Sequence, residues 1–371
     1  MGNFLKILNN SAERDGSYLP TLDGWRAIAI TLVLFEHGSD SINNVLNAVG
    51  INISIDSVGL LGVQIFFGLS GFLITSRLIA SENKYSRISL RSFYIRRAFR
   101  ILPPALVFLA TIGILALLGI IPITFGRWIS SLFFFSNYST ATGTWYLGHF
   151  WSLAVEEHFY MIWPALFLIL GINSRRVNVA IAMALLLACW RALDIHFNIT
   201  GATPAMFWGR SDIQGDNILW GAVIALLYAD PAWKDRLNKF LKLPAILPSF
   251  IIFIIVLAIL PSPIRKLSFI LLTIKPIIIP LIILGTIINS SRILSYILET
   301  PILKLIGRLS YSLYLWQQLF MVLNKASVPS FGILQSLPFN IIAALTCATL
   351  SYLFIEKPLI AVGHRIASKT I

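Results

Sequence analysis

Long apolar stretches alternate with short polar joints along nearly the whole chain. A bilayer hydrocarbon core of ~30 Å needs ~20 apolar residues per helix, and runs of about this length recur throughout the sequence. The pattern predicts an all-α, polytopic membrane bundle of about ten transmembrane helices. We expect the spans at residues 23–40, 58–79, 101–121, 148–170, 177–196, 213–229, 244–261, 268–289, 302–324 and 336–356.

Basic side chains gather in alternate joints. Residues 76–100 carry seven Lys and Arg side chains, whereas residues 41–57 carry none. Because Lys and Arg accumulate in cytoplasmic loops, joint 76–100 and both chain termini are expected to face the cytoplasm. Joint 230–243 agrees with this orientation, but Arg265 and Lys266, on the expected outer side, disagree with it.

The composition allows one membrane domain and no separate soluble domain. With 57% hydrophobic and only 12% charged residues, the chain has too little polar surface for a soluble globular fold. We expect a transmembrane domain over residues 22–358, with cytoplasmic tails at 1–21 and 359–371. The N-terminal tail lacks the apolar region and cleavage site of a secretory signal peptide.

The net charge of +13 does not indicate a nucleic-acid partner, because the basic residues form short clusters between apolar runs. Cys189 and Cys347 stand singly inside such runs. They form neither a metal-ligand spacing nor a disulfide framework. We therefore predict no nucleic-acid partner and no metal, and membrane lipid as the surrounding medium.

The first span contains ionisable side chains, which are costly in a bilayer and usually mark functional sites. In LDGWRAIAITLVLFEHG, Arg26 and His37 are eleven residues apart, so they point nearly the same way, ~16 Å apart along the helix. An imidazole can take a proton from a hydroxyl near neutral pH, and an arginine suits a phosphate. Alternatively, Arg26 snorkels to the interface and His37 caps the other helix end.

The fourth span contains a second group of polar side chains, in HFWSLAVEEHFYMIWP. Glu156 lies four residues after Ser152 and seven after His149, so these three share a helical face. Glu157 lies about 100° away, so at most one carboxylate can point straight at a common partner. Glu156 facing His37 would orient the imidazole, as the acid does in hydrolase triads. A structural hydrogen bond between helices is the alternative.

Two further stretches supply candidate ligands for an acyl donor. In FYIRRAFRILPP, Arg97 and Arg100 stand three apart at an expected helix start, where two guanidinium groups could clamp a diphosphate. Arginines that only mark a cytoplasmic loop would give a similar sequence pattern. In GVQIFFGLSGFLIT, Ser70 stands between Gly68 and Gly71, and such small residues permit close helix packing or the approach of a ligand. Taken alone, this stretch favours packing.

A polar group is also expected at the mouth of the sixth span, on the outer side. In GRSDIQGDNILWG, Arg210, Asp212 and Asp216 stand close together along the chain. Arg210 and Asp212 could bind sugar hydroxyls, and an ion pair that secures the helix end is the alternative.

Together these stretches resemble the acyltransferase 3 family of bacterial integral-membrane O-acyltransferases, from Leu22 to about Pro358. The motifs that carry the resemblance are LDGWRAIAI, FFGLSGFLI, RRAFRILPP, FWSLAVEEHFYMIWP, LSYSLYLW and IEKP. Each is weak alone, but together they occur in the family's order. The resemblance implies a ten-helix bundle that transfers an acyl group, usually acetyl, from coenzyme A to an extracytoplasmic glycan.

Residue by residue, the resemblance assigns roles to several positions of this chain. His158 stands where the family commonly has glutamine, and Gln317 stands where many members have histidine, which puts any role of Gln317 in doubt. The matching positions are Arg26 and His37 for the family's arginine and catalytic histidine, Arg97 and Arg100 for its RxxR element, and Glu156 and Glu157 for its EE pair.

The resulting hypothesis is an enzyme of the bacterial cytoplasmic (inner) membrane. Acetyl-CoA, as acyl-CoA donor, would bind at Arg26, Ser70, Arg97 and Arg100, and His37 with Glu156 would catalyse transfer directly or through an acyl-histidine. Glu157, Arg210 and Asp212 would bind a lipid-linked or polymeric glycan such as O-antigen or exopolysaccharide. The rivals are a proton-coupled secondary transporter, for which we find no inverted repeat, and a non-catalytic scaffold.

Overall fold

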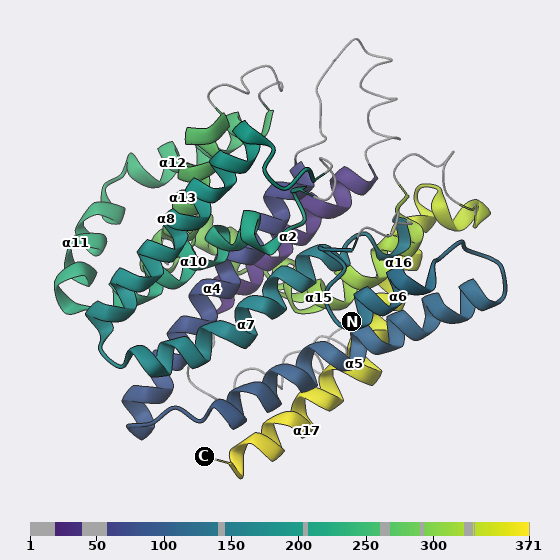
Figure 1. The fold of residues 1–371 in the computed structure, drawn as a ribbon, viewed down its shortest axis with the longest axis horizontal. Coiled ribbons are helices and arrows are strands. Elements are labelled where there is room, and N and C mark those ends of the chain that lie inside the picture. The colour runs from purple at the N-terminus through teal and green to yellow at the C-terminus, as the bar shows by residue number, and fades with distance from the viewer. Residues whose placement is uncertain are drawn as a thin grey trace.

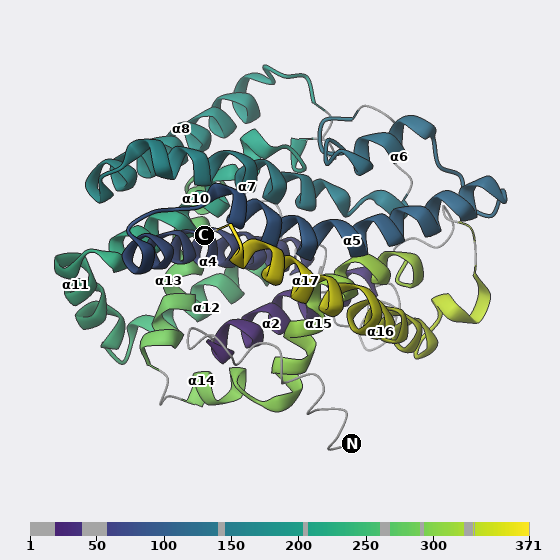
Figure 2. The ribbon, with the colours of Figure 1, turned by 90° about the horizontal axis from the view of Figure 1, so that it is seen from below.

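The computed structural model describes residues 19–38, 58–139, 145–202, 207–259, 268–289, 293–322, 329 and 331–370, and these ranges contain helices and no strand. Figures 1 and 2 show the helices packed against one another in a single bundle. The predicted all-α class is therefore confirmed for the described part of the chain. Most of the expected N-terminal tail, joint 41–57, Arg265 and Lys266 lie outside the described residues.

Within the described ranges, five helical stretches are long and apolar enough to cross a membrane, so the protein is a multi-pass membrane protein. They are α4 (Val58–Tyr85), α5 (Leu90–Leu117), the turn η2 (Trp145–Leu147) with α7 (Phe150–Leu170), α8 (Asn173–Phe197) and the C-terminal stretch Phe339–Ser368. A sixth exists if α11 (Pro231–Lys242) and α12 (Ile246–Ile259), which meet at 75°, form one bent span. The count of ten and the orientation of the termini stay predictions.

Four more helices coincide with predicted spans but are shorter or more polar. These are α2 (Pro20–His37), α10 (Ser211–Ala229), α13 (Ser268–Ile288) and α15 (Pro301–Phe320). Three short helices complete the described chain: α6 (Phe125–Leu132), α14 (Ile293–Leu298) and η5 (Gly332–Gln335). Of the ionisable groups that the sequence singled out, α2 carries Arg26 and His37, and α10 carries Asp212 and Asp216.

The start of α5 differs from the sequence prediction. Arg97 and Arg100 were expected at a helix start, but α5 begins at Leu90, so both arginines lie inside the helix. The physical reason is the cap at Ser89, whose hydroxyl oxygen accepts a hydrogen bond from the Ser92 amide at 3.2 Å. As a result, both guanidinium groups project from one face of a rigid helix.

The C-terminal region is helical through most of the predicted tail, residues 359–371. Helix α16 (Phe339–Ser351), the π-helical turn η6 (Tyr352–Glu356) and α17 (Lys357–Ser368) follow one another without a break, and the cytoplasmic location of the tail stays a prediction. Pro358 does not interrupt α17 because it stands in the first turn, where its missing N–H is not needed. Figure 2 shows α17 lying along α5.

Close packing of α4 against α10 confirms the packing interpretation of the FGLSG stretch. A Cβ on Gly71 would lie 1.9 Å from the Ile218 carbonyl oxygen, and a Cβ on Gly221 would lie 2.3 Å from the Gly68 carbonyl oxygen. Only glycine permits backbones to approach this closely. Ser70, between the two glycines of α4, lines a cavity instead.

A buried ion pair joins α8, α10 and α13. Arg191 forms a bidentate pair with Asp216 at 2.7 and 2.8 Å, and the two side chains are only 2% and 0% exposed. Arg191 also donates to the carbonyl oxygens of Ile213 and Leu272, at 2.8 and 3.0 Å. The remaining hydrogen-bonding capacity of a buried charge is thus largely satisfied by the fold itself.

Candidate active site

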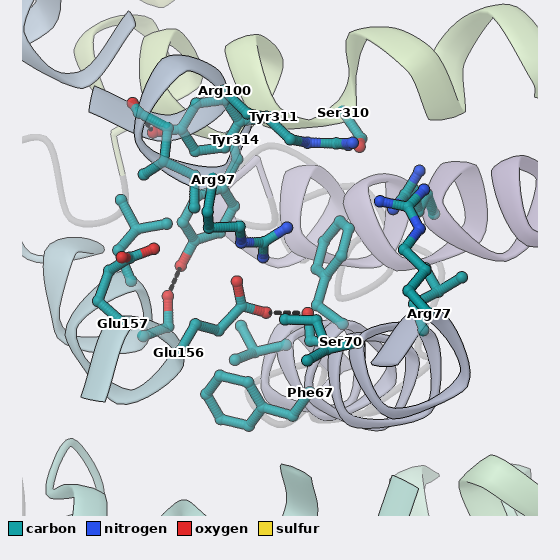
Figure 3. A pocket seen from close by; sticks show the side chains of 18 residues that line it. Phe67, Ser70, Arg77, Arg97, Arg100, Glu156, Glu157, Ser310, Tyr311 and Tyr314 are labelled. Carbon is teal, nitrogen blue, oxygen red and sulfur yellow. Dashed lines mark hydrogen bonds between the residues drawn. The ribbon is translucent and has the colours of Figure 1, made fainter. Parts of the chain in front are cut away.

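Helices α2, α4, α5, α7 and α15 surround a cavity with about 850 Å³ of empty space, including its opening (Figure 3). Its wall consists of four arginines, two glutamates, five hydroxyl-bearing side chains and seven apolar residues. Of the nine site residues predicted from the sequence, six line this cavity: Arg26, Ser70, Arg97, Arg100, Glu156 and Glu157.

The four arginines reach the cavity from three helices. Arg97 and Arg100 come from α5, Arg26 from α2 and Arg77 from α4, and Figure 3 shows Arg77 and Arg97 on different sides of the cavity. Arg26 lies 3.3 Å from Asp23. By contrast, no described residue forms a hydrogen bond or ion pair with Arg77, Arg97 or Arg100. Three guanidinium groups without such a partner therefore share one cavity.

Arg97 is nevertheless held in place by an aromatic ring. Its guanidinium carbon lies 3.7 Å from the centre of the Tyr160 ring, a cation–π contact that restrains the side chain while leaving its N–H groups for a ligand. The Tyr160 hydroxyl lies 2.8 Å from Ser70 Oγ and 3.0 Å from Glu156 Oε2. Ser70 in turn donates to Glu156 Oε1 at 2.7 Å (Figure 3). This triad ties α7 to α4 beneath Arg97.

His37 does not line the cavity, and it does not pair with Glu156. Its Nδ1 lies 2.8 Å from Gln317 Oε1, and its ring meets the Trp145 ring edge-on, with 4.8 Å between centroids. The expected His37–Glu156 pair is therefore wrong, because Glu156 is occupied by Ser70 and Tyr160. Gln317, from α15, contacts the imidazole in place of Glu156.

Tyr314 belongs to the cavity wall and lies on the same helix as the residue that contacts His37. It lines the cavity, and it precedes Gln317 by three residues, one turn of α15. Its hydroxyl lies 2.6 Å from Ser152 Oγ. A residue of the cavity wall and the residue that contacts His37 are thus neighbours on one face of α15.

Arg210 and Asp212 lie away from the cavity and bind each other. Arg210 donates two hydrogen bonds to the Asp212 carboxylate, at 3.0 and 2.7 Å, and Trp190 and Tyr138 donate to the same carboxylate. Burial, and then the nearby Asp212 charge, raise the pKa of Tyr138, so its hydroxyl stays protonated and donates. This arrangement is the ion pair that the sequence left open as the alternative to sugar binding.

Sequence reasoning missed three residues of the site. Arg77 belongs to the basic joint 76–100 and was interpreted as part of the topology signal. An arginine that lines a cavity and one that only marks a cytoplasmic joint look the same in the sequence. Tyr314 and Gln317 belong to a helical repeat of aromatic and polar residues that is typical of packing. For Gln317, the departure from the family's histidine was the one available signal.

The described helices thus form a multi-pass bundle with an arginine-lined cavity. The family model described as "Acyltransferase domain" matches residues 19–356. The chain therefore belongs to the acyltransferase 3 family. No solved structure matches the chain.

Relatives with curated descriptions support an acyltransferase. The "Putative peptidoglycan O-acetyltransferase YrhL" of Bacillus subtilis is 30% identical over 95% of this chain and 57% of the relative. A "Putative O-acetyltransferase" of Staphylococcus aureus is 30% identical over 92% and 57%. The "Peptidoglycan O-acetyltransferase OatA" of Listeria monocytogenes is 28% identical over 92% and 56%. The chain thus spans little more than half the length of these relatives.

Proposed function

We propose that this protein transfers an acetyl group from acetyl-CoA to a hydroxyl of a cell-envelope glycan at the bacterial cytoplasmic membrane. One observation carries the proposal. Three arginines without an ion-pair partner among the described residues line a cavity whose wall includes Tyr314, and Tyr314 lies one turn of α15 before Gln317, the residue that contacts the His37 imidazole.

The excess of cationic groups in the cavity supports a polyanionic donor. Its wall contains four arginines but only two glutamates. Guanidinium groups form short, charge-assisted and often bidentate hydrogen bonds with phosphates. Coenzyme A carries a diphosphate and a separate phosphate monoester, so Arg97 and Arg100 would hold the diphosphate while Arg26 and Arg77 bind the rest of the charge. The seven apolar side chains would then enclose the pantetheine arm.

His37 is assigned the general base. Its Nε2 would accept the proton of the glycan hydroxyl, whose oxygen attacks the thioester carbonyl carbon. The C–S bond then breaks, and the leaving coenzyme A thiolate takes the proton back from His37. Because Tyr314 and Ser152 line the cavity and Tyr314 lies one turn of α15 before Gln317, we assign their hydroxyls to the thioester end of the donor.

Glu156 takes a different part from the one the sequence suggested. Through Tyr160 it supports the ring beneath Arg97, so we assign it a positioning role at the phosphate end. Glu157 also lines the cavity, and its role toward substrate stays a prediction.

Peptidoglycan is the acceptor that we favour. Two of the three relatives above carry peptidoglycan in their names, whereas the sequence motifs led to O-antigen or exopolysaccharide. Because the chain covers little more than half of those relatives, the acceptor is a proposal for this chain.

The test is thiol release from acetyl-CoA by the purified protein in lipid vesicles, with soluble peptidoglycan fragments as acceptor. His37→Ala should lower the rate by about 10²- to 10⁴-fold, the usual contribution of a general base. His196→Ala, which removes an exposed imidazole at the end of α8, is the matched control. Undiminished acetylation in His37→Ala refutes the assignment, and solute uptake without thiol release supports the transporter.

A further inference from the structure

The geometry points to Gln317 as a positioning residue that sets the protonation pattern of His37, so that Nδ1 carries the proton and Nε2 is the basic nitrogen. The catalytic consequence rests on the proposed acyltransferase function. The protonation pattern itself follows from hydrogen bonds alone and is measurable without any activity.

The contact joins two helices that are distant in sequence. His37 is the last residue of α2, and Gln317 lies near the end of α15, 280 positions later. Their side chains meet at 2.8 Å between Nδ1 and Oε1, and Gln317 is fully buried. A buried amide that faces an imidazole must either accept a hydrogen bond from the ring or donate a hydrogen bond to it.

A chain of hydrogen bonds decides which of the two occurs. Gln317 Nε2 donates to Gln318 Oε1 at 2.8 Å, and Gln318 Nε2 donates to the backbone carbonyl oxygen of Trp145 at 2.7 Å. A carbonyl oxygen can only accept. If both amides were flipped, the Gln318 oxygen would face that carbonyl without a proton between them. A flip of Gln317 alone would place two amide oxygens against each other, and a flip of Gln318 alone would oppose two N–H donors.

The direction of the chain therefore runs from His37 to Trp145. Gln317 presents its oxygen to the ring, so Nδ1 must carry the hydrogen. In a neutral imidazole this leaves the lone pair on Nε2. No described residue forms a hydrogen bond with Nε2, and unlike both ring nitrogens of His149, Nε2 is not a buried atom without a partner.

The charged and titratable groups around His37 are accounted for as follows. On α2, Glu36 accepts a hydrogen bond from a backbone amide of α4. From the start of α7, His149 is buried and lacks a described partner at either ring nitrogen. Arg127 of α6, near enough to His149 to interact with it electrostatically, donates to a backbone carbonyl. Of the described residues, only Gln317 forms a hydrogen bond with the His37 ring.

The experiment compares Gln317→Met with Gln317→Glu in vesicles. Gln317→Met keeps the size but removes the acceptor, so kcat should fall by on the order of 100-fold with the KM for acetyl-CoA unchanged. Gln317→Glu adds a carboxylate, which favours the protonated imidazole. Because a base works only when neutral, the acid limb of the pH–rate profile should move upward by about one unit.

Gln214→Met is the matched control. Gln214 is also a buried glutamine with both amide ends bonded, but it lies at the start of α10 and does not line the cavity. Its rate and pH profile should equal those of the wild type. A merely structural role for Gln317 would lower the amount of folded protein and leave the pH profile in place, and that result overturns the inference.

A second measurement separates this inference from the proposed function. The chain contains five histidines, so solid-state NMR of protein labelled with ¹⁵N-histidine in bilayers is tractable, with the His37 signals assigned by their loss in His37→Ala. At pH 8 we expect a protonated Nδ1 and an unprotonated Nε2, and a mixed pattern in Gln317→Met. The opposite pattern in the wild type refutes the inference, whereas absence of thiol release refutes only the enzymatic proposal.

Discussion

Two groups of arginines in this bundle have opposite surroundings. Arg191 is buried between α8, α10 and α13, where Asp216 and two backbone carbonyls accept hydrogen bonds from its two terminal nitrogens. Arg77, Arg97 and Arg100 share a cavity and have no ion-pair or hydrogen-bond partner among the described residues. All are arginines on helices of one bundle, yet only the first has its charge balanced from within.

The difference separates charges that build the fold from charges that await a ligand. A charge removed from water is costly unless it is paired and hydrogen-bonded, so Arg191 and Asp216 form a unit that joins three helices. Cationic groups left without such a unit around a cavity keep their affinity for anions. Partners, and not residue type, therefore distinguish structural arginines from binding arginines.

The largest expected effect breaks the paired group. Asp216→Ala leaves the Arg191 charge buried without its partner, and should destabilise the protein by about 3–5 kcal/mol. The measurement is the folded fraction during SDS titration of the purified protein. Replacing both residues, as Arg191→Met with Asp216→Leu, should restore most of the stability because no buried charge remains. If Asp216→Ala alone is as stable as the wild type, the account of the buried ion pair is contradicted.

The next effect concerns the cavity arginines. Arg77→Ala, Arg97→Ala and Arg100→Ala should each raise the KM for acetyl-CoA by about tenfold to a hundredfold, the worth of one charge-assisted hydrogen bond. Stability in SDS should not fall, since each change removes one of several like charges. Arg175→Ala, at an exposed arginine of α8, is the control. Loss of folded protein at unchanged KM would place these arginines in the structural group.

The smallest effect concerns the pair of Arg210 and Asp212, which is paired like Arg191 but partly exposed, at 17% and 24%. Solvent screens such pairs, so Arg210→Gln should cost only about 0.2–1 kcal/mol of stability. The KM for acetyl-CoA should stay unchanged because neither residue lines the cavity. A strong fall in the rate of transfer to peptidoglycan fragments, measured at saturating acetyl-CoA, would instead support the sugar-binding role that the sequence suggested.

Much of the site was within reach of sequence reasoning, and its failures have a common cause. Arg26 and Glu156 were singled out because an ionisable group in an apolar span is rare and costly, and Arg97 and Arg100 because two guanidinium groups three residues apart could clamp a diphosphate. Arg77 was missed because an arginine in a basic joint looks the same whether it orients the chain or lines a cavity.

Partner choice was the least predictable feature. Helical periodicity places residues on a face of their own helix, but it says nothing about which other helix lies opposite. The assignment of Glu156 to His37 failed for this reason: Ser70 and Tyr160 were near enough to take the carboxylate, and Gln317 took the imidazole.

By itself, the sequence determined that the chain is helical, lies in a membrane and carries an imidazole and arginines that a bilayer tolerates only for a reason. These properties follow from composition and from the period of a single helix, which act over a few turns. Only the tertiary structure decided which arginines are paired, that His37 lies beyond the cavity, and that an amide from α15 holds it. Such contacts depend on how helices distant in the chain cross, and local pattern does not encode that geometry.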